Sequence, residues 1–320
     1  MGCGHELIVV GGEALVDLVE ERDGRRAVAG GGPFNTAVAL GRLGVPVSFL
    51  GAISRDAYGT MLAGHLDDAA VDMSLIRWSD AETPTALVEH GPGGGNVYTF
   101  ALAGTAFADL SVEDVPVLPP DAWALHLGTL SLAIDPPAEA YEALIEREAG
   151  LRKIVLDPNV RPEIFGDQAG YQARFTRLAQ SADVVKLSED DARWLYPALG
   201  LAELIAQLLD LGPRIVAITR GARGAVAAAA DTSMVEVGGV EVDVVDTVGA
   251  GDSFGAALIA ALIAERALGP GVNVSPDETV LRHAVSYAVA ASAITCTRAG
   301  AIPPTAAEVS ALLASEAKPA

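Results

Sequence analysis

The stretch with the clearest chemical potential is residues 242–257, VDVVDTVGAGDSFGAA. Its apolar start predicts a strand that ends at Asp246, and its glycines predict a tight turn before a helix that opens near Asp252. Amides in such a turn, together with the unpaired N–H groups of a helix N-terminus, make a site for an anion. The backbone of Gly249, Ala250 and Gly251 is therefore the predicted anion hole.

Asp252 is an unusual choice beside an anion site, because a carboxylate repels phosphate. It fits a general base that takes a proton from an alcohol attacking a bound phosphoryl group. An aspartate in the first turn of a helix also serves as a cap. The residues alone leave both roles open.

Two other nucleotide-binding patterns fit this stretch poorly. A Walker A loop needs a lysine after its glycines, and none of the three lysines follows a glycine loop. They are Lys153, Lys186 and Lys318. Gly249, Gly251 and Gly255 give G-x-G-x-x-x-G late in the chain, so a dinucleotide-binding dehydrogenase is a weak alternative.

Composition narrows the function classes further. Of the 320 residues, 51% are apolar, which is enough for a large core, and 42 acidic against 21 basic residues give a net charge of −21. A surface with this much negative charge repels nucleic acid and anionic membranes, and we expect neither as a partner.

The cysteines and the N-terminus bear on location. Two cysteines, Cys3 and Cys296, make no disulfide framework, and the N-terminus lacks the pattern of a signal peptide, so we expect a cytoplasmic protein.

The elements that must position these residues alternate along the chain. Short β-rich runs predict strands at 7–10, 47–53, 124–127, 154–156, 184–187 and 215–219. Helical patterns lie at 35–43, 58–70, 137–149, 170–179, 190–195, 201–211, 251–265, 277–298 and 305–314. This order predicts an α/β fold with a mostly parallel sheet and helices on both faces.

Two stretches lack a helix between their strands. Residues 13–29 predict two strands around Arg22-Asp23-Gly24, and residues 85–102 predict two strands around the glycine-rich segment 91–95. The four strands would form either a small antiparallel sheet that acts as a lid or two unrelated surface hairpins.

Two motifs together resemble the PfkB (ribokinase-like) carbohydrate kinases. One is DTVGAGDSF at 246–254, and the other is GGGPFNTA at 30–37. The stretches at 13–17, 128–132 and 157–161 are similar to the fructokinase branch. The resemblance implies one ribokinase-like domain over 1–320, a Rossmann-type αβα sandwich with a small β-sheet lid formed by about 13–29 and 85–102.

The resemblance also implies a mechanism and a sugar site. Asp252 would be the base, and the amides of 249–251 would stabilise the transferred phosphoryl group. The implied sugar-binding residues are Asp17, Gly31, Gly32, Asn35, Tyr98, Arg161 and Asp252. The residues alone also allow other roles for these positions. The two glycines could simply form a turn, Asp17 could be a solvated side chain, and Arg161 could form an ion pair on the surface.

For the cofactors, the resemblance implies ATP with Mg²⁺. Its implied nucleotide-binding residues are Ser188, Thr219, Gly221, Gly224, Gly251, Val289 and Ala293, of which the last two fit a helix core equally well. Asp191 stands where the family has a glutamate that influences the Mg²⁺ waters, and its reach is shorter. A loop for K⁺ would include Asp246, Val248, Arg298 and Gly300, although Pro303-Pro304 replace a serine common in the family.

Fructose is the substrate that the branch similarity favours. Ribose, 2-keto-3-deoxygluconate and nucleosides are the alternatives, and an acidic sugar is disfavoured because Tyr98-Thr99-Phe100 lacks the arginine of the family's lid strand. A sugar-binding sensor that has lost catalysis is an alternative from another class. The exposed edges of a lid sheet also predict a homodimer.

Overall fold

The main sheet is built from strands that are nearly all buried. The structure is a computed structural model that describes residues 7–21, 24–90 and 96–316. Over these residues the strand order is β13-β12-β11-β10-β9-β8-β1-β4-β5. The strands are β1 (Leu7–Gly11), β4 (Val47–Ser54), β5 (Ile76–Ser79), β8 (Ala122–Gly128), β9 (Lys153–Asp157), β10 (Val184–Ser188), β11 (Ile215–Thr219), β12 (Ala225–Ala229) and β13 (Val235–Val237). All pairs are parallel except β11–β12 and β12–β13.

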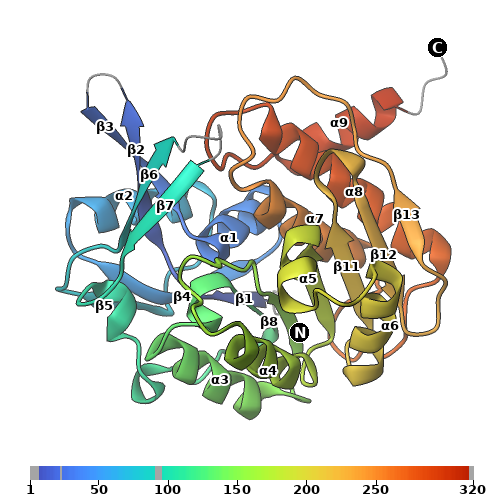
Figure 1. Ribbon diagram of the computed structural model, residues 1–320, viewed down its shortest axis with the longest axis horizontal. Coiled ribbons are helices and arrows are strands. Elements are labelled where there is room, and N and C mark those ends of the chain that lie inside the picture. Colours follow the sequence, from blue (N-terminus) through green and yellow to red (C-terminus); the bar gives the residue numbers. More distant parts are fainter. Residues whose placement is uncertain (1–6, 22–23, 91–95, 317–320) are drawn as a thin grey trace, which may run out of the picture.

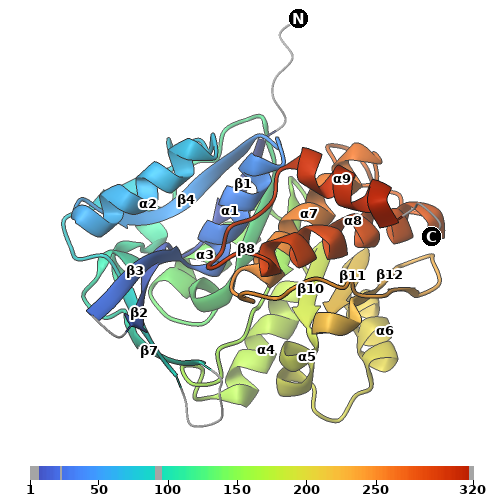
Figure 2. The ribbon, with the colours of Figure 1, turned by 90° about the horizontal axis from the view of Figure 1, so that it is seen from above.

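Helices cover both faces of this sheet (Figures 1 and 2). One face carries α1 (Gly32–Arg42), α2 (Ala57–Asp68), α7 (Ala250–Ala264), α8 (Glu278–Cys296) and α9 (Ala306–Glu316). The other carries α3 (Pro137–Glu148), α4 (Gln168–Ala179), α5 (Glu189–Leu195) and α6 (Leu201–Leu211). Successive strand residues point to opposite faces, so Ile8 and Val10 join the first core and Val9 joins the second. The predicted αβα sandwich is confirmed.

A smaller sheet lies beside the main one (Figure 1). Its order is β3-β2-β6-β7, with β2 (Leu15–Glu21), β3 (Gly24–Gly30), β6 (Thr85–His90) and β7 (Asn96–Ala101). The two predicted hairpins therefore share one sheet and are not separate. They join through a parallel pair, β2–β6, where an antiparallel sheet was expected. The predicted turn residues Arg22, Asp23 and 91–95 lie outside the described residues.

The prediction of a strand that ends at Asp246 is wrong. Residues 242–245 form no strand, and Val244 and Val245 expose 62% and 63% of their surface. The amides of Val245 and Asp246 instead donate to the carbonyl of Cys296 at the end of α8, at 2.8 and 3.2 Å. The apolar pattern indicates a buried strand, but the backbone here bonds to the end of α8, about fifty positions away in the sequence, and the valine side chains stay exposed.

Three strands were not predicted. β12 reads AVAAA, and alanine is a poor strand former, so its pattern indicates no strand. Pairing with β11 along five residues makes it one. β5 and β13 are short edge strands, and their few residues give a weak pattern. Within the described residues, no helix is both long and apolar enough to cross a membrane.

Candidate active site

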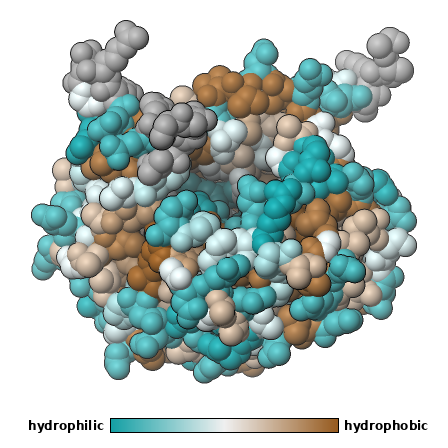
Figure 3. Space-filling view, in the orientation of Figure 1, coloured by the Kyte–Doolittle hydropathy of each residue, from teal (hydrophilic) through white to brown (hydrophobic). Residues whose placement is uncertain are grey.

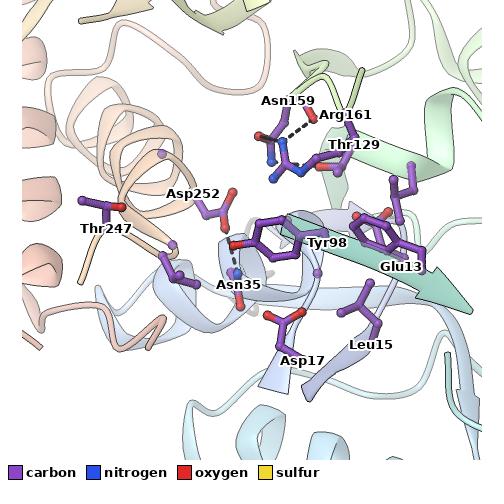
Figure 4. A pocket seen from close by; sticks show the side chains of 17 residues that line it. Glu13, Leu15, Asp17, Asn35, Tyr98, Thr129, Asn159, Arg161, Thr247 and Asp252 are labelled. Atoms are coloured by element: carbon purple, nitrogen blue, oxygen red, sulfur yellow. Dashed lines mark hydrogen bonds between the residues drawn. The ribbon is translucent and has the colours of Figure 1, made fainter. Parts of the chain in front are cut away.

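A pocket of about 240 Å³ opens where the carboxyl ends of β1, β8 and β9 face the smaller sheet. Figure 3 shows a hollow near the middle of this face of the molecule, and Figure 4 shows the pocket from close by. Ligand sites in open α/β sheets commonly lie outside these strand ends. The lining residues are Glu13, Leu15, Asp17, Gly31, Gly32, Asn35, Tyr98, Phe100, Thr129, Leu130, Asn159, Arg161, Thr247, Val248, Gly249, Gly251 and Asp252.

Asp252 lies in the first turn of α7 and is only 7% exposed. Its Oδ2 accepts a hydrogen bond of 2.8 Å from Nδ2 of Asn35, which projects from α1 (Figure 4). Burial raises the pKa of Asp252 to about 6, with the Asn35 bond opposing the rise and the charge of Asp157 adding to it. Asp252 is therefore ionised at neutral pH and more basic than an ordinary aspartate.

The turn before α7 has the geometry predicted for it. Gly249 adopts φ 75°, ψ 0°, the left-handed conformation that favours glycine, and a Cβ on it would lie 2.5 Å from Cβ of Ala301. Gly249 and Gly251 line the pocket. Ala250 is absent from the described lining, and its amide makes a 3.3 Å bond to the carbonyl of Thr247. The predicted anion hole thus has two of its three residues on the pocket wall.

The predicted sugar residues meet on the other side of the pocket. Gly31 has φ 106°, and a Cβ on Gly32 would lie 2.3 Å from Oγ1 of Thr129, so only glycine fits both positions. Asp17 comes from β2 of the smaller sheet, and burial raises its pKa to about 6 while the charge of Arg161 opposes the rise. The pocket wall therefore combines the backbone at the start of α1 with a carboxylate from the smaller sheet.

Arg161 supplies positive charge to a pocket of an otherwise acidic protein. Its Nη1 donates to Oδ1 and the carbonyl of Asn159 at 2.8 and 2.9 Å, and to the carbonyl of Val160 at 3.1 Å. It is the only lysine or arginine in the pocket lining that the structure describes. Its charge lowers the pKa of Asp17 and Asp252, against the stronger effect of burial.

The predicted nucleotide residues lie apart from this pocket. Ser188 ends β10 and pairs in register with Thr219 at the end of β11, so the two are neighbours. Gly221 and Gly224 follow in a short 3₁₀ turn, both with positive φ. Val289 and Ala293 are 6% and 9% exposed on α8. Except for Gly251, the structure places no predicted nucleotide residue in the described lining, and their role stays a prediction.

Two aspartates predicted near metal ions are already hydrogen bonded. Asp191 accepts from the amides of Val160 and Ser188, both at 2.7 Å, one on each oxygen. Its second bond completes a capping box at the start of α5. Both oxygens of Asp191 therefore already accept hydrogen bonds from the backbone, and its influence on Mg²⁺ stays a prediction.

Asp246 joins the two loops predicted to hold K⁺. Its oxygens accept from the amides of Val248 at 3.1 Å and Gly300 at 2.8 Å. The side chain of Arg298 forms an ion pair with Glu308, so only the backbone carbonyl of Arg298 is left as a ligand for a cation. Among the described residues no group of three or more His, Cys, Asp or Glu side chains could hold a metal ion.

Glu13 is a pocket residue for which the sequence predicts no role of its own, although it lies in the 13–17 stretch that is similar to the fructokinase branch. It is 2% exposed, and its Oε2 accepts from the amide and Oγ of Ser131 at 3.2 and 2.7 Å. Burial raises its pKa to about 7, against the Ser131 bonds. The signal was present, because Glu13 and Ser131 belong to two of the fructokinase-like stretches. Leu15, Thr129 and Asn159 also line the pocket and lie in the fructokinase-like stretches, but the sequence predicts no role for them.

Comparison with known proteins shows the family of this chain. The pfkB family carbohydrate kinase model matches residues 5–308. A fructokinase of Rhizobium leguminosarum bv. trifolii is 39% identical over 87% of this chain and 86% of its own.

Two solved structures share the fold over nearly the whole chain. A Xylella fastidiosa fructokinase with bound ATP has a TM-score of 0.88 at 25% identity and covers 98% of this chain and 100% of its own. A double mutant of Vibrio cholerae O395 fructokinase, with fructose, ADP and potassium bound, has a TM-score of 0.83 at 28% identity, covering 97% and 98%. The chain therefore belongs to the pfkB family of carbohydrate kinases.

Proposed function

We propose that the chain is an ATP-dependent fructokinase with Asp252 as its general base. The observation that carries the assignment is the buried Asp252 carboxylate on the pocket wall, next to Gly249 and Gly251 at the N-terminus of α7. A proton acceptor and an anion site are thereby held side by side. Phosphoryl transfer to an alcohol needs both in this arrangement.

In the proposed reaction, Asp17 and Asn35 hold the sugar so that one hydroxyl faces Asp252. The carboxylate of Asp252 takes the hydroxyl proton while the oxygen forms a bond to the γ-phosphorus of ATP. The bond from that phosphorus to the β-γ bridging oxygen breaks, and ADP leaves with the electron pair. The amides of Gly249 and Gly251, with Arg161, stabilise the charge on the transferred group. Mg²⁺, held through the ATP phosphates, would neutralise further phosphate charge.

Fructose is the substrate supported best. The relative and the two solved structures are all named fructokinases, and one of them binds fructose and ADP. The pocket volume of about 240 Å³ suits a small sugar. In the described lining Arg161 is the only lysine or arginine, and the proposed reaction uses its charge on the transferred phosphoryl group, which leaves no second cation for the carboxylate of an acidic sugar.

A nucleoside is the second candidate, because two aromatic rings line the pocket. Tyr98 and Phe100 on β7 are stacked with ring centroids 6.0 Å apart and planes inclined by 22°. Such rings also suit a nucleobase. Ribose and 2-keto-3-deoxygluconate have no comparable feature in their favour.

The smaller sheet is proposed to act as a lid, because Asp17 and Tyr98 reach the pocket from it. Closing it would exclude water from the transferred phosphoryl group. A homodimer through the edges of this sheet and a cytoplasmic location stay predictions. Light scattering at working concentration tests the dimer, and a monomer contradicts it.

A substrate panel tests the assignment. ADP release with Mg-ATP is measured over fructose, ribose, 2-keto-3-deoxygluconate and adenosine, and kcat/KM is compared. We expect fructose to exceed the others by at least tenfold. Preference for adenosine would support a nucleoside kinase. Sugar binding by folded protein without any turnover would support a sugar-binding sensor that has lost catalysis.

A further inference from the structure

Lys186 is a buried cation that the proposed reaction does not yet use. It lies on β10, is 4% exposed, and its Nζ donates to Oδ2 of Asp157 on neighbouring β9 at 2.8 Å. Asp157 is 3% exposed, and its Oδ1 has no hydrogen-bond partner. A charged pair is thus enclosed in the protein with part of its bonding capacity unused.

The pair faces the helix that carries Asp252. Val155 and Val184, two residues before Asp157 and Lys186, pack in the same core as α7, and alternate strand residues share a face. A Cβ built on Gly251 would lie only 3.1 Å from Nζ of Lys186. The ammonium group therefore lies against the backbone of Gly251, a residue that lines the pocket.

The surroundings of Lys186 keep it charged. Burial alone would lower the pKa of its ammonium group, but the carboxylates of Asp157, Asp191 and Asp252 together raise that pKa above the ordinary value. Fold stability alone gives little reason for such a pair, since an apolar pair of similar volume is often equally stable or better. A fixed positive charge behind an anion hole, in contrast, can stabilise negative charge on a bound phosphoryl group.

We infer that Lys186 is a positioning residue that supplies fixed positive charge directly beneath the Gly249–Gly251 anion hole. This inference rests on the proposed kinase function and extends it. Lys186 keeps its proton throughout the reaction, and the sugar proton still goes to Asp252. Its charge acts through the backbone of Gly251 on the transferred group, where negative charge grows in the transition state, and it favours the ionised form of Asp252.

The test separates the charge of Lys186 from its packing. In the double variant Asp157→Asn with Lys186→Gln, two amides replace the two charges and can still hydrogen bond. Asp157→Asn alone keeps the cation. A matched control is Lys153→Gln with Asp183→Asn, which neutralises a 2.9 Å pair at the opposite end of β9. Each variant is checked by circular dichroism and thermal unfolding, then assayed for kcat, the KM of fructose and the Kd of ADP.

We expect the Lys186 double variant to lose about 10²-fold in kcat, the loss typical when one anion-hole donor is removed. The KM of fructose and the Kd of ADP should stay within about threefold, because Lys186 acts on the transferred group. Asp157→Asn and the Lys153 control should keep kcat within about fivefold. A purely structural pair would instead make Asp157→Asn as harmful as the double variant, because that change leaves the buried lysine without its charged partner.

A folded Lys186 double variant with near wild-type kcat overturns the inference. If the amide pair does not fold, Asp157→Leu with Lys186→Met replaces it, and a folded but inactive Asp157→Asn also contradicts the inference. Wild-type enzyme in the same assay keeps the two claims apart. Lack of fructose turnover by the wild type counts against the proposed function, whereas wild-type turnover with an equally active double variant counts against Lys186 alone.

Discussion

Nδ2 of Asn35 donates a 2.8 Å hydrogen bond to Oδ2 of Asp252, across 217 positions of sequence. Asn35 belongs to the glycine-rich start of α1, and Asp252 to the first turn of α7. The bond ties the proposed sugar site to the proposed base. With Oδ2 held by the amide, we expect Oδ1 to be the atom that accepts the sugar proton.

The pH profile of kcat/KM should report Asp252. Its pKa is raised to about 6 by burial, so the base becomes protonated as pH falls through that value. We predict at least a tenfold loss of kcat/KM per pH unit below about pH 6, because Asp17, whose pKa is also raised to about 6, loses its charge in the same range, and little change between pH 7 and 8. The hydrogen bond from Asn35 lowers the pKa of Asp252, so Asn35→Ala should move this limb to higher pH. Activity that is flat down to pH 5 would show that Asp252 is not the base.

Asp252→Asn should stabilise the fold at neutral pH. The pKa of Asp252 in the folded protein, about 6, exceeds the ordinary aspartate value of 3.8, so the ionised carboxylate opposes folding above about pH 6, and this cost vanishes below about pH 4. Two pKa units correspond to roughly 3 kcal/mol, which is an upper bound on the gain. Urea unfolding of both proteins at pH 4 and pH 8 measures it. If the difference in free energy of unfolding between the variant and the wild type is the same at pH 4 and at pH 8, the pKa of Asp252 is not raised.

Gly249→Ala should damage the turn before α7. The substitution places a Cβ 2.5 Å from that of Ala301 in a left-handed conformation, which alone costs about 1 kcal/mol or more. We expect a lower melting temperature and at least a tenfold loss of kcat. Gly255→Ala is the control on the same helix, because its Cβ would meet nothing within 4 Å. If both variants behave alike, the special geometry of Gly249 is not needed.

Asp17→Asn should weaken fructose binding more than turnover. Asp17 is proposed to accept sugar hydroxyl groups, and bonds to a charged group contribute about 1.5–3 kcal/mol. The KM of fructose is expected to rise by tenfold or more, while the KM of ATP stays unchanged. Steady-state kinetics with each substrate varied in turn gives both values. An equal rise in both would place Asp17 outside the sugar site.

The sequence predicted those parts of the site that depend on local pattern. The 249–252 turn is predicted from the residues themselves, because a helix N-terminus after a tight turn demands particular residue types. The glycines at 31 and 32 were predicted from the family resemblance, since on the residues alone they also fit a plain turn. β12 was missed because only pairing with β11 makes its alanines a strand. The contact of Lys186 with Gly251 joins two segments more than sixty positions apart and has no local signal.

The most direct test of the central claim is fructose-dependent ADP release by the wild type and Asp252→Asn, measured side by side at pH 8 with Mg-ATP. We predict clear turnover by the wild type and a loss of about 10²–10⁴-fold in kcat for the variant, the usual contribution of a general base. Fructose affinity, measured by calorimetry, should be nearly unchanged. A variant with full activity, or a folded wild type that releases no ADP with fructose, would contradict the account.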